Sequence, residues 1–158
     1  MSRFMRKGTT KLYWVASISN ITAPTAAEMG SAVALTDEIA EINGFSFSNS
    51  PIDVPDMGDA FVSRIPGEDT VGDSSIMFYE RTDSNTIMTT LAKDTTGYVV
   101  IFPTGIAGAS PAANDTADIW PATVASNARQ YNAGNEAARF EVVFTLTASP
   151  AIDATVVA

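Results

Sequence analysis

The residues of this chain best suited to chemistry are six acids that lie close together in the sequence. All six fall within residues 50–73, and clustered carboxylates can bind a hard cation such as calcium or act as a general acid and base. The first three are spaced three residues apart, which matches no EF-hand loop. A weak cation site and a carboxylate-based hydrolase therefore stand beside a third interpretation, a solvated or inter-subunit acidic face. The six are Asp53, Asp56, Asp59, Glu68, Asp69 and Asp73.

The chain contains neither cysteine nor histidine in its 158 residues, and this removes most other catalytic chemistry. Disulfides, thiolate and imidazole metal ligands, and the Ser-His and Cys-His nucleophile systems are all excluded. No Walker-type or dinucleotide fingerprint is present, and Gly67 and Gly72 flank acids that would repel a phosphate. We therefore expect no cofactor and no enzymatic activity.

The formal net charge of −9 is distributed unevenly. Four of the nine cations lie in the first eleven residues, so the rest of the chain carries five cations against eighteen acids, a balance of −13. An acidic body of this kind should repel DNA. We predict that residues 1–8 form a flexible basic arm, either frayed in solvent or able to touch nucleic acid. No segment has the length of a membrane span or a signal peptide, which predicts a soluble protein that folds in the cytoplasm.

Alternation of apolar and polar residues predicts strands through most of the chain. Residues 139–147 show the pattern best, with Phe140, Val142 and Phe144 on one face. Pro121 has no N–H to donate, so its strand should lie at the edge of a sheet or begin there. The other predicted strands are residues 11–18, 45–48, 75–80 and 98–102.

One helix of about three turns is predicted between residues 83 and 97, where Asp83 or Ser84 can cap the start and Gly97 can close the end. A shorter turn should begin at Thr25, because Thr25 and Glu28 have the spacing of a capping box. Together these elements predict one mainly β domain over residues 1–158, a two-sheet sandwich or barrel with one flanking α-helix and a long inter-strand loop.

The segment between the strands near residues 45 and 75 is unusually long. Connections inside compact domains usually take about 4–6 residues, and disordered segments are poor in large apolar side chains. Residues 50–73 are long but rich in such side chains, so we predict an assembly loop that docks on another subunit. The residues predicted to form the subunit interface are Pro51, Ile52, Val54, Pro55, Met57, Phe61, Val62, Ile65 and Pro66.

Four longer segments keep a characteristic order and spacing along the chain. They are RKGTTKLYWVASI (6–18), SRIPGEDTVGDSSIMFYE (63–80), KDTTGYVVIFPTG (93–105) and GNEAARFEVVFTLTASPA (134–151). With the size of the chain, they resemble the major tail protein, or tail tube protein, of bacteriophages with long, non-contractile tails.

This resemblance implies a small β-sandwich or barrel whose subunits form rings of six, stacked into a tube through which the genome passes. It implies that the segment from Pro51 to Pro66 docks on a neighbouring subunit or on the next ring. It also implies partners in the tail tip, tape-measure and terminator proteins, assembly in the host cytoplasm, and a place in the virion with DNA passing unbound. A β-sandwich virion module that does not polymerise, such as a head-decoration protein, is the alternative.

Overall fold

The computed structural model describes all 158 residues, and most of its regular structure is β-strand. The mainly β fold is confirmed, although the large sheet is open rather than closed into a barrel, and there are two short helices rather than one. The elements are β1 (Lys11–Val15), α1 (Ala26–Gly30), β2 (Val33–Ala34), the 3-10 turn η1 (Thr36–Glu38), β3 (Ile39–Asn43), β4 (Phe47–Val54), β5 (Ser63–Val71), β6 (Ser74–Tyr79), α2 (Thr86–Thr90), β7 (Thr96–Phe102), β8 (Thr116–Gln130), β9 (Arg139–Leu146) and β10 (Ala151–Thr155).

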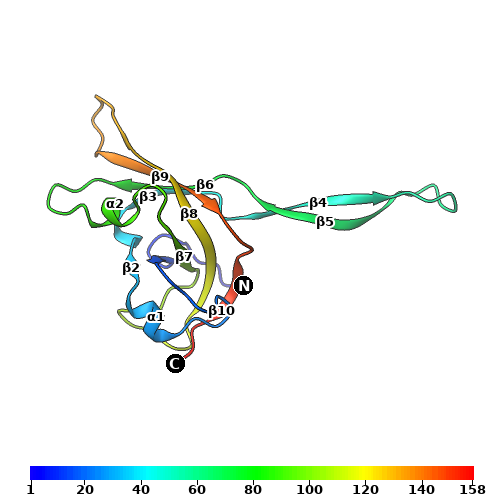
Figure 1. Cartoon of the computed structure of the whole chain (residues 1–158), viewed down its shortest axis with the longest axis horizontal. Helices are drawn as coiled ribbons and strands as arrows, with labels where there is room; N and C mark the ends of the chain where they lie inside the picture. The colour runs from blue at the N-terminus through cyan, green and yellow to red at the C-terminus, as the bar shows by residue number, and fades with distance from the viewer.

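Eight strands form one antiparallel sheet in the order β2-β1-β7-β8-β9-β6-β3, with β10 paired to β8, while β4 and β5 form a separate ribbon. The large sheet is strongly curled (Figure 1). Trp14 on β1 and Phe144 on β9 have two strands between them, yet their ring centroids are 5.9 Å apart. In a flat sheet such strands would lie about 14 Å apart, since neighbours are about 4.8 Å apart. The curl therefore brings the two ends of the sheet around a shared core.

Both faces of the curled sheet are covered. Successive residues of β1 enter different cores, because side chains alternate across a strand: Leu12 and Trp14 join the inner core, and Tyr13 and Val15 join the outer one. The outer core is completed by Met29 from α1 and by β10. The sequence predicted only one apolar face for this strand.

The strand predicted at residues 139–147 is confirmed as β9, with Phe140, Val142 and Phe144 all buried in the inner core. The prediction for Pro121 is wrong, because it lies inside β8, which runs through the middle of the sheet. β8 pairs with β10 up to Ile119 and with β9 from Ala122 onward. Proline is tolerated at this point because the partner on that side of β8 changes there, so no ladder bond needs its missing N–H.

The two helices differ from their predictions in opposite ways. Thr25 caps α1 through the predicted capping box with Glu28. α2 spans only Thr86–Thr90, not about three turns, and Gly97 belongs to β7 instead of closing the helix. No helix in the structure combines the length and the apolar character needed to cross a membrane.

Candidate assembly surface

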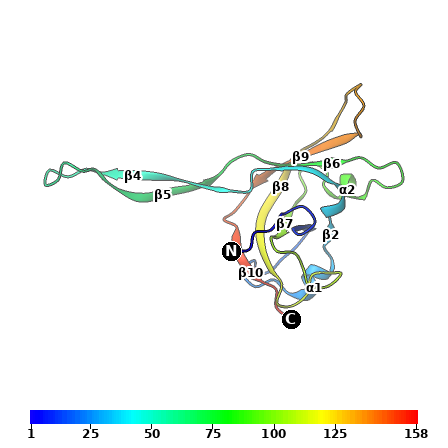
Figure 2. The same cartoon turned by 180° about the vertical axis from the view of Figure 1, so that it is seen from behind.

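Residues 47–71, which we call the arm, form a long β-hairpin. β4 and β5 pair from Phe47 with Val71 at the base to Val54 with Ser63 near the tip, and neither strand joins the large sheet. Figures 1 and 2 show the arm projecting far beyond the rest of the molecule, the body. The long connection predicted at residues 50–73 is therefore present, but most of it is paired strand rather than loop.

A β-bulge interrupts the arm between its base and its tip. Pro66 and Gly67 on β5 lie opposite the single residue Pro51 on β4, since the register shifts between the pairs on either side. Neither proline has an N–H to contribute to the ladder. Asn49 replaces part of the missing pairing, because its amide oxygen accepts from the Gly67 N–H at 3.2 Å and its amide nitrogen donates to the Gly67 carbonyl at 3.0 Å. A side chain at position 67 would collide with the Ser50 carbonyl oxygen.

The two faces of the arm differ in character. Ile52 lies directly opposite Ile65, and Val54 follows on the same side, so these three form what we call the apolar face. Asp53 and Arg64 are paired on the other side, with Arg64 Nε 2.7 Å from Asp53 Oδ1. All five side chains are exposed, so the apolar face is covered by nothing in the chain.

The tip of the arm is folded by its own acids. Asp56 Oδ1 accepts from the backbone N–H of Gly58 at 2.7 Å and of Asp59 at 3.1 Å, and Asp59 Oδ1 accepts from the N–H of Phe61 at 3.0 Å. These are Asx-type turns, which such residues commonly form. Because Asp53 is instead held by an arginine, the three acids do not gather into a cation site, and no metal-binding group of three acids occurs in the structure. The structure therefore does not bring Asp53, Asp56 and Asp59 together as the cation-site interpretation requires.

The base of the arm is fixed to the body by backbone geometry and aromatic packing. Gly44 has a φ of +84°, and a Cβ there would lie 2.5 Å from the Asp73 carbonyl oxygen, so only glycine fits between β3 and β4. The buried Ser74 hydroxyl accepts from the N–H of Phe45 at 3.1 Å. Trp120 packs against Phe45 and also against Phe47, both with ring centroids 5.7 Å away.

The structure places all nine predicted interface residues on the arm, and all nine are exposed. Six of them are large apolar side chains. A group of such side chains exposed to water on one ribbon usually marks a site where another molecule binds. The sequence missed Phe47, which is also exposed, and the aromatic contact with Trp120 that fixes it. That contact joins residues distant in the sequence, so no local pattern signals it.

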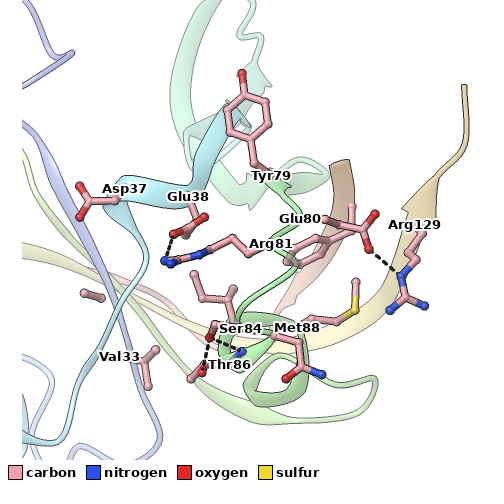
Figure 3. Close-up of a pocket in the computed structure, with 14 residues that line it drawn as sticks. Val33, Asp37, Glu38, Tyr79, Glu80, Arg81, Ser84, Thr86, Met88 and Arg129 are labelled. Atoms are coloured by element: carbon pink, nitrogen blue, oxygen red, sulfur yellow. Dashed lines mark hydrogen bonds and ion pairs between the residues drawn. The ribbon is translucent and has the colours of Figure 1, made fainter. Parts of the chain in front are cut away.

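A second feature is a hollow of about 280 Å³ on the body, between η1, the segment after β6, and α2 (Figure 3). Most of its charged groups are already paired. Arg81 contacts Glu38 at 2.9 Å and Asp83 at 2.6 Å, and Arg129 contacts Glu80 at 2.6 Å.

These pairs account for Glu38, Glu80, Arg81 and Arg129 of the lining, whereas Asp37 forms no ion pair. The hydrogen bonds with Asp83, and then with Glu38, raise the pKa of Arg81, and the same Arg81 hydrogen bond lowers the pKa of Asp83. The hydrogen bond with Glu80 raises the pKa of Arg129. The charged forms of Arg81, Asp83 and Arg129 are therefore stabilised by their partners.

Comparison with solved structures identifies chains with a similar fold. One is a chain of the baseplate of the anti-feeding prophage, with 13% identity, a TM-score of 0.56, and coverage of 94% of this chain and 95% of that one. Another is a chain in the sheath/tube terminator structure of an extracellular contractile injection system, with 10% identity, a TM-score of 0.61, and coverage of 93% and 95%. At these identities the likeness establishes the fold alone.

A search of curated protein sequences finds no match. The family model described as phage tail tube protein matches residues 1–158, the whole length of the chain. The chain therefore belongs to the phage tail tube protein family, and it is a structural component of the phage tail rather than an enzyme.

Proposed function

We propose that this protein assembles with copies of itself into rings of six, that the rings stack into the tail tube, and that the arm makes the docking contact. The observation that carries this proposal is the arm itself, a paired ribbon that leaves the body with an uncovered apolar face. A neighbour that covers this face removes its apolar side chains from water, and that burial stabilises the contact.

The direction of the arm supports a head-to-tail contact. It projects from one side of the body (Figure 1), and a contact between it and a different surface of the next subunit is heterologous. Heterologous contacts of this kind close into rings when the rotation between subunits permits, and extend into filaments when it does not. If each ring also makes a heterologous contact with the next ring, the rings stack into a tube.

The proposal includes a passage for DNA and a set of tail partners. The acidic composition of the body supports a lumen that does not bind DNA, because proteins bind DNA largely through cations that neutralise its phosphates. The tail tip, tape-measure and terminator proteins are the proposed partners, with assembly in the host cytoplasm before the subunits become part of the virion. The non-contractile type of tail is part of the same proposal.

Electron microscopy of purified protein tests the assembly directly. The wild type should form rings or tubes in negative stain at high concentration. In the matched variant, residues 51–67 are replaced by Asn-Gly, which joins the opposed residues Ser50 and Glu68 through a tight two-residue turn. This variant should keep the circular dichroism and thermal unfolding of the body but form no rings.

Two results would overturn the proposal. One is wild-type protein that stays monomeric at high concentration even with the tail tip added as a nucleus. The other is a shortened variant that still forms wild-type tubes, because the arm would then not be the docking element.

A further inference from the structure

The positive charges of this chain fall into two groups. Every cation after residue 11 forms an ion pair with a carboxylate, at distances of 2.6–3.8 Å. These are Arg64, Arg81, Lys93, Arg129 and Arg139. The remaining cations, Arg3, Arg6, Lys7 and Lys11, form no ion pair, so all the unpaired positive charge of the subunit is concentrated at one end of the chain.

The N-terminal segment, residues 1–10, also carries large apolar side chains beside its basic ones. Phe4 and Met5 are exposed, and the Arg6 guanidinium lies 5.7 Å from the centre of the Phe4 ring. Arg6 starts a short turn, because its carbonyl accepts from the N–H groups of Thr9 and Thr10. The segment thus offers a cation and an aromatic ring together, both exposed to solvent.

The arm carries the complementary features. Asp56, Asp59, Glu68, Asp69 and Asp73 lie on the arm or next to its base, and none of them has a cation partner in the structure. Glu68 lies opposite Ser50, two residues before Ile52 on β4, and therefore shares the apolar face of the arm. This face can bind a segment that is both apolar and basic, and no other unpaired positive segment exists in the subunit.

We propose that the apolar face of the arm binds the N-terminal segment of a second copy of this chain, with Phe4 and Met5 on the apolar side chains and Arg3, Arg6 and Lys7 beside the acids. This inference rests on the proposed self-assembly and names the surface that the arm meets. Lys11 is held in β1, whose partners are β2 and β7, and the segment makes no ion pair with the arm of its own chain. A second copy can bring the two surfaces together in the head-to-tail manner already described.

The size of the electrostatic effect follows from the exposure of the groups. Exposed ion pairs are individually weak, and three of them together change an equilibrium constant by about tenfold. Salt screens such pairs, because the Debye length falls from about 10 Å at 0.1 M to about 3 Å at 1 M. The concentration of wild-type protein needed for assembly should therefore rise about tenfold between these two concentrations of sodium chloride.

Charge-swapped variants test the pairing. One variant carries R3E, R6E and K7E, and the other carries E68K and D73K; the side chains of Glu68 and Asp73 make no ion pair, so their reversal breaks no pair within the subunit. Each variant alone should need at least about ten times more protein to assemble, since like charges then face each other. Mixed in equal amounts, the two should assemble as the wild type does, because each N-terminal segment again meets an arm of opposite charge.

The controls separate this inference from the proposed function. K93E reverses one exposed charge on the body and should leave assembly unchanged. The proposed pairing is overturned if the wild type forms tubes and the N-terminal variant assembles as well as the wild type does. It is also overturned if the two charge-reversed variants form no tubes either alone or mixed. Both outcomes leave the proposed self-assembly intact. Wild-type protein that never assembles overturns both. Binding of labelled duplex DNA by the wild type at 0.1 M salt, lost in the N-terminal variant without rescue on mixing, would assign the segment to nucleic acid instead.

Discussion

Replacing Ile52, Val54 and Ile65 with serine should raise the concentration needed for assembly by about a hundredfold. The side chains are 52%, 42% and 52% exposed in the free subunit, so about half of each remains to be buried at a contact. Full burial of such a side chain contributes about 1.5–3 kcal/mol, and half of it about 0.8–1.5 kcal/mol. The three together contribute about 3 kcal/mol, and each 1.4 kcal/mol corresponds to a factor of ten.

Sedimentation of assembled protein over a range of total concentrations measures this change. Thermal unfolding of the monomer should be almost unchanged, because the three side chains belong to neither core of the body. The matched control is D53N with R64Q, which removes an exposed pair from the opposite side of the arm and should change the assembly concentration by less than about fivefold.

Two outcomes would refute this reasoning. An unchanged assembly concentration in the serine variant would show that the apolar face stays in solvent in the assembled state. A monomer that loses its β-type circular dichroism would show that the arm is needed for the fold of the body, so that loss of assembly would be indirect.

Three further predictions concern the fold. Phe144→Ala should lower the free energy of unfolding by about 3–5 kcal/mol in urea titrations, since the ring is buried in the inner core; a loss below about 1 kcal/mol would contradict that packing. Gly44→Ala should lower the thermal midpoint, because the new Cβ would lie 2.5 Å from the Asp73 carbonyl oxygen, and an unchanged midpoint would show that the base can shift freely. Hydrogen bonds, chiefly from the Ser19 hydroxyl, lower the pKa of Glu28 from 4.5 to about 2, so its stabilising effect is complete above pH 4.5 and is lost as the pH falls toward 2. The stability difference between the wild type and Glu28→Gln should shrink across that window, and a constant difference would contradict the shifted pKa.

Features governed by neighbours in the sequence could be predicted from the sequence. Phe140, Val142 and Phe144 alternate with more polar residues, and a half-buried strand is the usual outcome of that period. Thr25 and Glu28 lie one helical turn apart, so the capping box could be identified without knowing what surrounds it. The nine interface candidates were found for a similar reason, because exposed apolar residues in a polar segment are a local signal.

Features governed by distant contacts could not be predicted. The end of α2 depends on β7 and β8: the Asp94 N–H donates to the Val124 carbonyl, and the Val124 N–H donates to the Thr95 carbonyl, which draws these residues into the sheet. The strands of the arm were not predicted, because Pro51 and Pro66 normally argue against a strand. Both prolines lie at the bulge, where the ladder is already interrupted, and only the paired register reveals this.

The paired state of the arm has a consequence for the speed of assembly. Fixing the backbone of one residue costs about 1–2 kcal/mol, and in this chain that ordering takes place during folding, before two subunits meet. Segments that must fold as they bind add a slow step to association, whereas a preformed segment needs only the correct encounter. The growth rate of a tube should therefore rise in proportion to the concentration of free subunits, without a plateau set by rearrangement of the arm.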